Sequence, residues 1–234
     1  MKKQIIFVSI LFFFSTLMFS QPNGSGTFSS PYYGTISSNT TWYPDTYPDQ
    51  TVYVTNLTIA SGATLTISPG TYYGGLVQFF AGSSLTISSG CTVIINPGIG
   101  VTVDEIYNSG TLRLESSSNE AGVASLIHDL YEDTGGGIVE TKLYLSGGTT
   151  SSGDYKWHYI SVPVSNVNVS TFNTLNLAQY IESLVVGADN FPGWVAYDGY
   201  QYSTGNTLAN SFSILTLGKG YNYYSAEGNT FTFS

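Results

Sequence analysis

Acidic side chains are the first candidates for chemistry in this sequence, because two carboxylates beside a groove can cleave a glycosidic bond. The acids nearest a run of regular strand-like repeats are Asp104, Glu105 and Glu115. Asp104 and Glu105 are neighbours, so on a continuous strand their side chains should point to opposite faces. Arg113 is the one base in this run that could pair with a sugar carboxylate. We therefore interpret these acids as solvated turn residues and expect no catalytic residue here.

A second acidic group could bind calcium through its hard oxygen ligands. Asp129, Glu132 and Asp133 surround Tyr131, but no alternating Asp/Asn loop with a fixed glycine and a distal glutamate accompanies them. They are weak candidates for a structural calcium site, and a merely charged junction is the alternative. We expect no other cofactor.

Histidine and cysteine residues are too few to form a zinc site. His128 and His158 are the only histidines, and neither has a Cys or His neighbour at ligand spacing. His158 is expected to be an ordinary alternating strand residue. The single cysteine, Cys91, lacks a cationic neighbour that would stabilise a thiolate, so we expect it to be buried at a corner.

Aromatic residues near the C-terminus remain as candidate ligand contacts. They are Trp194, Tyr197, Tyr200 and Tyr202, accompanied by Tyr221, Tyr223 and Tyr224. Such rings bind sugars and partner proteins because they present large, rigid surfaces. Trp194 and Tyr197 should point to opposite faces of a strand, so only part of the set can share a face. Burial in a sandwich core is the alternative interpretation.

The elements around these candidates are short, regularly spaced β-strands. Apolar triplets, most with a central threonine, occur at 57–59, 65–67, 77–79, 85–87, 93–95, 101–103 and 112–114. Hairpins of a sandwich could produce this pattern, but three-residue strands with Ser-Gly corners favour a right-handed parallel β-solenoid. A rung of roughly 20 residues agrees with the recurrence of Leu65 as Leu85.

The chain is therefore predicted to be all-β, with two folded parts. Residues 21–50 are expected to form an N-terminal cap or linker, and 51–127 a solenoid of about three rungs. A junction at 128–137 leads to an antiparallel β-sandwich over 138–234, because the strand candidates there are longer and rich in aromatic residues. One short helix could lie within 172–184. The last strand candidate stops in mid-alternation, which suggests the N-terminal part of a longer protein.

The first 20 residues have the order of a Sec-type signal peptide. Lys2 and Lys3 precede an apolar run from Ile5 to Phe19, which is short for a membrane span. An uncleaved anchor is the alternative. The formal net charge of the whole chain is -9, so nucleic acids and anionic membranes are poor partners. We expect an exported chain without a span in its mature part, either secreted or attached to the outer cell surface.

Several phrases of the sequence also resemble a known protein layout. "GATLTISPGT", "GSSLTISSG" and "NSGTLRLES" are followed by "WHYISVPVS", "GWVAYDG" and "LGKGYNYY". In this order they resemble secreted surface proteins of the Bacteroidetes, over Thr51 to Ser234. The resemblance implies a β-solenoid stub, then a sandwich opened by a Trp-His-x-Ile-Ser-x-Pro phrase, here Trp157, His158, Ile160, Ser161 and Pro163. It also implies a sorting domain for type IX secretion, which this sequence does not show, and no catalytic residues.

The sequence thus predicts an acidic surface protein with a structural or adhesive role and no catalytic activity. A carbohydrate-binding or carbohydrate-processing protein is the second hypothesis. A pair of spacer modules, in a longer protein whose function lies beyond residue 234, is the third. The expected partners are glycans or surface proteins.

Overall fold

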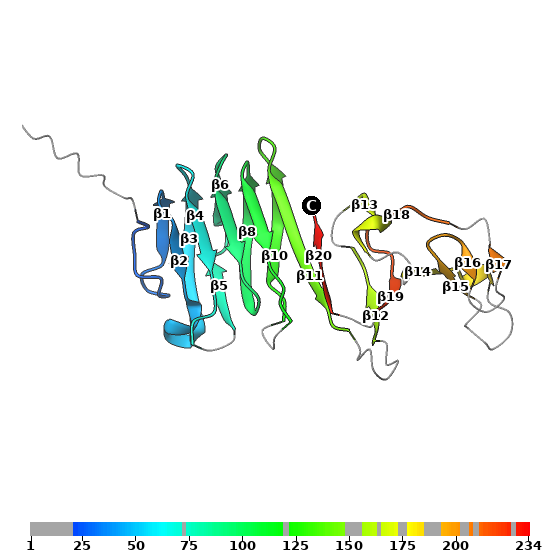
Figure 1. Cartoon of the computed structure of the whole chain (residues 1–234). Coiled ribbons are helices and arrows are strands. Elements are labelled where there is room, and N and C mark those ends of the chain that lie inside the picture. The colour runs from blue at the N-terminus through cyan, green and yellow to red at the C-terminus, as the bar shows by residue number, and fades with distance from the viewer. Residues whose placement is uncertain are drawn as a thin grey trace, which may run out of the picture.

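The computed structural model is an all-β protein whose strands form two groups along the chain (Figure 1). The structure describes residues 21–71, 74–118, 122–147, 156–162, 165–172, 177–184, 193–201, 206–207, 211–225 and 228–234. Within these ranges there is no α-helix, which confirms the predicted class. Short 3-10 turns occur at η1 (Pro44–Thr46), η2 (Pro48–Gln50), η3 (Val169–Thr171) and η5 (Glu182–Leu184). The predicted leader at 1–20 lies outside the described residues.

One parallel sheet runs through the first group of strands. It contains β1 (Tyr32–Ile36), β3 (Thr51–Ile59), β5 (Gly75–Phe79), β6 (Ser84–Ile87), β8 (Ile99–Asn108) and β10 (Ser125–Asp133). The first half of the long strand β3 pairs with β5, and its second half pairs with β6. The long strands therefore contribute two sides of a coil, and each side stacks on its copy one turn away.

A second sheet supplies the remaining side of the coil. It contains β2 (Thr40–Trp42), β4 (Thr64–Ile67), β7 (Thr92–Ile95), β9 (Thr111–Leu114), β11 (Ile138–Leu145) and β20 (Asn229–Phe233). The strands from β2 to β11 pair in parallel, and only β20 is antiparallel. Because the chain passes back and forth between the two sheets, the first part is a β-solenoid, of about four turns (Figure 1).

The repeat length of the solenoid differs from the predicted value. Leu65 pairs in register with Val93, 28 residues along the chain, and Leu85 pairs with Leu57. The predicted recurrence of Leu65 as Leu85 is therefore wrong, because these two leucines lie in different sheets. Similar Ser-Gly corners occur on both sides of the coil, so in the sequence two neighbouring sides resemble two successive turns.

Side-chain alternation fills the solenoid core as predicted. In β4, Leu65 and Ile67 are buried, whereas Thr66 between them points outward and is half-buried. Full burial of each such aliphatic side chain stabilises the fold by about 1.5–3 kcal/mol. Cys91 is buried at the corner before β7, which confirms the expectation for this thiol.

Asn and Asp side chains satisfy backbone groups at the corners, one turn away. The pairs, acceptor first, are Asn39 and Thr64, Asp45 and Gly70, Asn56 and Ser84, and Asp104 and Gly82. In each pair a side-chain oxygen accepts the backbone N–H of a corner residue that has no strand partner for it. Gly70 lies close to Asp45: a Cβ at position 70 would be 2.6 Å from Asp45 Oδ1, so a larger residue there would displace the Asp45 side chain. These contacts hold successive turns in register.

Parallel stacking extends beyond residues 51–127 at both ends. β1 and β2 pair with the next turn, although they lie in the range predicted as a cap. β10 and β11 continue the stack through the predicted junction and into the range assigned to the sandwich. These strands lack the apolar–Thr–apolar phrase, so their sequences do not show that they belong to the coil.

The second group of strands forms an antiparallel sheet, which we call the C-terminal sheet. In spatial order it contains β12 (Lys156–Ile160), β19 (Tyr221–Ser225), β14 (Leu177–Tyr180), β15 (Trp194–Ala196), β16 (Tyr200–Gln201) and β17 (Asn206–Thr207). A separate pair comprises β13 (Val167–Asn168) and β18 (Ile214–Leu215). In the range where a short helix was considered, the described residues form β14 and the 3-10 turn η5.

The second solenoid sheet is shared between two hydrophobic cores. From β2 to β9 its inward side chains belong to the solenoid core. At β11 and β20, the corresponding side chains of Leu145, Phe231 and Phe233 belong to a second core. Leu177 and Tyr223 of the C-terminal sheet complete this core. One continuous sheet therefore joins the solenoid to the C-terminal part, and β20 lies beside that part (Figure 1).

Candidate functional site

The two neighbouring acids of the solenoid lie on the same side, contrary to the strand-alternation expectation. β8 bends between its halves, so Val103 and Ile106 are both buried, and Asp104 and Glu105 between them both face outward. Each has a structural contact, since Asp104 accepts the Gly82 N–H and Glu105 accepts the Tyr107 O–H at 2.9 Å. The hydrogen bond to Glu105 raises the pKa of Tyr107, because a phenolate would face the carboxylate.

The remaining solenoid acid and its basic neighbour are engaged in ion pairs between β9 and β11. Glu115 lies 2.9 Å from Lys142 Nζ, and Arg113 Nε pairs with Glu140 Oε2. Both pairs are partly exposed, so each contributes no more than about 1 kcal/mol. Arg113 therefore forms an ion pair between two turns of the solenoid. The sequence had instead suggested that it could pair with a sugar carboxylate.

The calcium candidates do not form one group. On β10, Glu132 points outward and is in register with Tyr107. Asp133 is in register with Asn108, whose side chain is buried. Asp133 Oδ1 accepts the backbone N–H groups of Gly135 and Gly137, each at 2.9 Å. In the part of the chain that the structure describes, no cluster of three or more His, Cys, Asp or Glu residues is arranged to hold a metal ion.

These turn contacts predict a pH dependence at Asp133. Hydrogen bonds from Gly137 and Gly135 lower the pKa of its carboxyl below the ordinary value. A lowered folded-state pKa means that the stabilising contribution is complete above the unfolded-state pKa and is lost as pH falls through the folded-state value. We expect the Gly137 amide shift, followed by NMR, to titrate with a midpoint below about 3.9, and this step to vanish in Asp133→Asn. A midpoint at or above that value would contradict the assignment.

The histidines lie in different parts of the fold. His128 is exposed on β10, the edge strand of the first sheet, and its ring centroid lies 6.2 Å from that of Tyr131. His158 lies on β12 in the C-terminal sheet, where it pairs with Tyr223. This position confirms the strand interpretation of His158.

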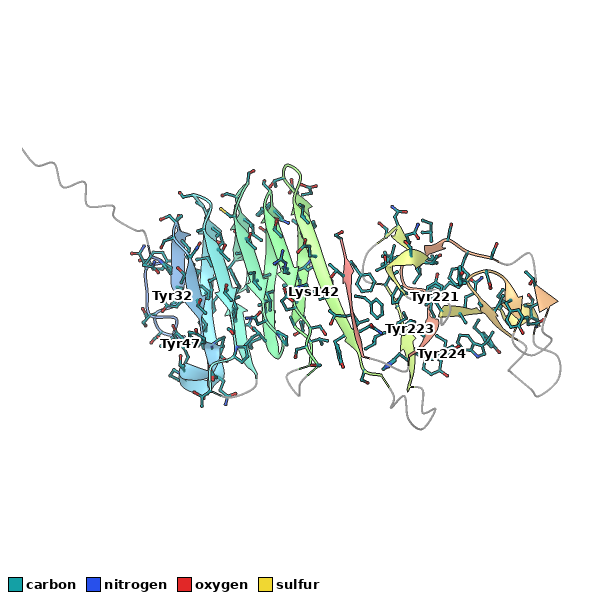
Figure 2. The ribbon with its side chains drawn as sticks, in the orientation of Figure 1. Tyr32, Tyr47, Lys142, Tyr221, Tyr223 and Tyr224 are labelled. Atoms are coloured by element: carbon teal, nitrogen blue, oxygen red, sulfur yellow. The ribbon has the colours of Figure 1, made fainter. Side chains whose placement is uncertain are left out.

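The C-terminal aromatic candidates are divided between the two faces of their sheet. Tyr221 and Tyr223 point into the second core and are fully buried, while Tyr224 points the other way (Figure 2). Trp194 is half-buried and Tyr200 is exposed, and the strand register places both on the same side as Tyr224. We call this side the aromatic face.

Of the two other candidates, Tyr197 does not join the aromatic face. Tyr197 packs against the second core and lines a hollow of about 320 Å³ with Val169, Asp198, Ser211, Phe212 and Ser213. Asp198 accepts the Tyr200 N–H at its turn. Tyr202 lies outside the described residues.

Two tyrosines that sequence reasoning did not select complete the aromatic face. Tyr159 on β12 is 79% exposed, and its ring centroid lies 6.1 Å from that of Trp194 at an interplanar angle of 44°. Tyr180 on β14 is the register partner of Trp194, at 5.2 Å and 60°. The apolar neighbour Ile160 was the available signal for Tyr159, because an inward side chain predicts an outward one at the next position of a strand, and Ile160 is buried.

Small and amide side chains lie between these rings. Asn222, Ala178 and Ala196 form one register row across the sheet, starting from Tyr159. All three are buried although they are on the aromatic face. Asn222 Oδ1 is fully buried and has no hydrogen-bond partner among the described residues. The rings of Tyr159 and Trp194 approach each other from strands that are not adjacent, which explains how this row is covered.

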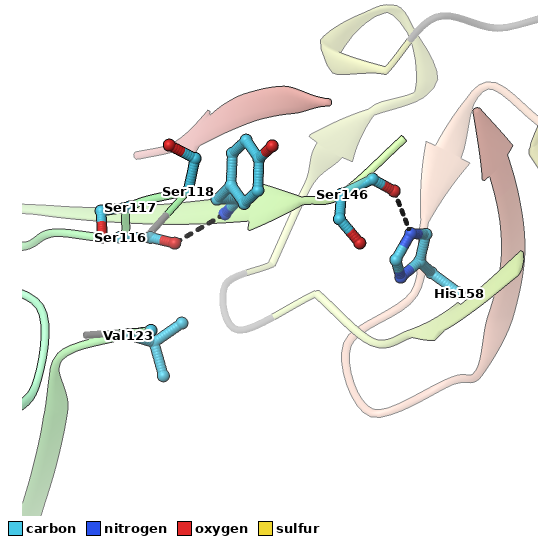
Figure 3. Close-up of a pocket in the computed structure, with 8 residues that line it drawn as sticks. Ser116, Ser117, Ser118, Val123, Ser146 and His158 are labelled. Atoms are coloured by element: carbon cyan, nitrogen blue, oxygen red, sulfur yellow. Dashed lines mark hydrogen bonds between the residues drawn. The ribbon is translucent and has the colours of Figure 1, made fainter. Parts of the chain in front are cut away.

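A polar hollow lies where the last solenoid turn meets the C-terminal part (Figure 3). Its volume is about 290 Å³, and we call it the serine pocket. It is lined by Ser116, Ser117, Ser118, Gly122, Val123, Tyr144, Ser146 and His158. No pattern in the sequence indicates this pocket, because its residues come from separate segments: 116–118, 122–123, the end of β11 and β12.

No described helix is long and apolar enough to span a membrane. Comparison with known protein families, curated proteins and solved structures finds no match to this chain.

Proposed function

We propose that this protein is an exported, acidic surface protein with a structural and adhesive role, which binds a partner protein through its aromatic face. The observation that carries the proposal is the cluster of Tyr159, Tyr180 and Trp194 on the outer side of the C-terminal sheet. Tyrosine and tryptophan dominate binding energy at protein interfaces because they offer large contact area with few rotatable bonds. An exposure of 79% at Tyr159 leaves most of its surface for a partner to bury.

The support beneath this face is rigid. Val195 and Tyr223 point to the opposite side of the same strands and are fully buried in the second core or beside it. The core is attached to the solenoid through β11 and β20. A ring cluster on such a support loses little conformational entropy on binding, which favours a useful affinity.

Ring geometry favours a protein partner for this face. The interplanar angles of 44° and 60° at Trp194 do not create the coplanar platform that would suit a flat sugar chain. None of the described side chains in these register rows is charged, and the exposed Asp198 lies at the adjoining turn. The matching surface is therefore apolar at its centre and basic at its rim.

The contacts of the residues with catalytic potential support the non-catalytic part of the proposal. Arg113 and Glu115 are held in ion pairs, and Asp104 and Asp133 accept backbone N–H groups. The proposed export rests on the leader-like first residues. The proposed surface location, with type IX secretion as the route, rests on the resemblance of the "WHYISVPVS" phrase to secreted surface proteins of the Bacteroidetes.

An array of purified extracellular proteins, including basic ones, tests the proposal on the full chain. We expect saturable binding that falls by roughly tenfold or more in Trp194→Ala and in Tyr159→Ala, as interface anchors do. Tyr33→Ala is the matched control, since Tyr33 is 50% exposed but lies on β1 of the solenoid. Absence of binding, or binding that both aromatic substitutions leave intact, would contradict an adhesive role for this face.

A further inference from the structure

The serine pocket has the composition of a small-ligand site, and it is separate from the aromatic face. It is bordered by Ser116–Ser118 and Gly122–Val123, by Tyr144 and Ser146 at the end of β11, and by His158 in the middle of β12 (Figure 3). His158 points to the side of the C-terminal sheet opposite to Tyr159, its neighbour in the strand. A ligand in this pocket would therefore not contact the aromatic face.

Hydrogen bonds fix two of the polar groups around the pocket. Ser116 Oγ accepts the Tyr144 N–H at 2.7 Å, which leaves the Ser116 hydroxyl proton as a donor. His158 Nε2 lies 2.8 Å from the carbonyl oxygen of Ser146. A carbonyl oxygen only accepts, so Nε2 carries the proton and Nδ1 of the neutral ring is an acceptor. The pocket thus combines an oriented donor with an oriented imidazole.

The charge and size of the pocket restrict the ligand. Among the described residues that line it, none is Asp, Glu, Lys or Arg, and the chain as a whole carries a net charge of -9. An anionic ligand would therefore meet a repulsive field without a cation to offset it. Val123, which is 52% exposed, and Tyr144 add apolar surface. About 290 Å³ is at the small end of ligand pockets, enough for one ring-sized molecule.

We propose that the serine pocket binds one neutral sugar residue, with the serine hydroxyls and His158 contacting its hydroxyl groups and Val123 and Tyr144 contacting its apolar side. This site would give the protein a second kind of partner, a glycan, beside the protein partner of the aromatic face. The inference stands independently of the proposed function, because the two sites share no residue.

NMR titration of the full chain with neutral methyl hexosides tests this site directly. We expect at least one of the methyl glycosides of glucose, galactose and mannose to produce saturable shifts at the Gly122 amide, with millimolar affinity. Glucuronate at the same concentrations should bind more weakly. The substitution Val123→Trp, which places a large ring in the pocket, should weaken binding at least tenfold. Ile127→Trp is the matched control, because Ile127 is equally an exposed aliphatic residue but lies on β10 outside the pocket lining.

A second variant distinguishes a loss of hexoside binding from a loss of folding. In His158→Phe the strand keeps an aromatic ring but the pocket loses the imidazole acceptor, so we expect weaker hexoside binding. The hydrogen bond to the Ser146 carbonyl that is also lost is only part-buried, so the unfolding midpoint should change little. Trp194→Ala should leave hexoside binding intact, which separates this site from the aromatic face. No saturable shift with any neutral hexoside, stronger binding of glucuronate, or full binding by Val123→Trp would overturn the proposal.

Discussion

Replacement of Asn108 by leucine is expected to lower the free energy of unfolding of the solenoid by about 3 kcal/mol. Asn108 is fully buried at the end of β8. Its Oδ1 accepts the Gly110 N–H, and its Nδ2 donates to the Ile138 carbonyl and to the Tyr131 hydroxyl. Leucine would leave the buried Gly110 N–H without its partner, which costs about 1–3 kcal/mol, and would also remove the part-buried hydrogen bond to the Ile138 carbonyl. Urea unfolding followed by circular dichroism measures the change.

Asn56→Leu provides the matched control for this prediction. Asn56 also accepts a backbone N–H, from Ser84, but it is exposed. Water can replace that hydrogen bond, so we expect a cost below about 1 kcal/mol. Equal costs at Asn108 and Asn56 would show that the buried amide does not hold the last turns together.

Phe231→Ala is expected to destabilise the C-terminal part by about 3–5 kcal/mol, the usual cost of deleting a buried phenyl ring. Phe231 is 6% exposed, and its ring centroid lies 4.6 Å from that of Phe172 and 5.3 Å from that of Tyr223. The side chain lies in the second core but belongs to a strand of the solenoid sheet. We therefore expect amide exchange to rise in the C-terminal sheet while β3 to β8 stay protected.

Thr232→Ala is the control within the same strand. Thr232 is exposed and points away from the second core, so its removal should change stability by less than about 0.5 kcal/mol. If Phe231→Ala raised exchange equally in both parts, the two cores would form one cooperative unit, and the shared sheet would not act as a joint between them.

Local alternation of apolar and polar residues made the solenoid predictable. Its end strands carry no such local signal, so the residues where the solenoid begins and ends were not predictable. Leu65-Thr66-Ile67 shows the inward, outward, inward pattern directly in the sequence. β10, in contrast, has Ile127 and Leu130 exposed at a sheet edge and carries acids along its length. β10 belongs to the solenoid because it pairs with β8, which lies a full turn earlier in the chain. Register between turns is a non-local property, so the predicted 20-residue rung was also wrong.

The candidate site was predictable only where a single strand determined it. Alternation separates Trp194 from Tyr197, and the structure places them as alternation requires. Tyr180 joins Trp194 through the pairing of β14 with β15, and Tyr159 comes from β12, which β19 and β14 separate from β15 in the sheet. The serine pocket likewise forms from separate segments, so no spacing rule could have revealed it.

A single binding experiment separates the aromatic face from the serine pocket in three forms of the full chain: the natural sequence, Trp194→Ala and Val123→Trp. Each form is applied to an array of extracellular proteins and to an array of neutral glycans, with and without Ca2+. We predict that Trp194→Ala removes the protein signal and leaves the glycan signal, that Val123→Trp does the reverse, and that Ca2+ changes neither. A protein signal that persists in Trp194→Ala would contradict the central claim that the aromatic face is the adhesive surface.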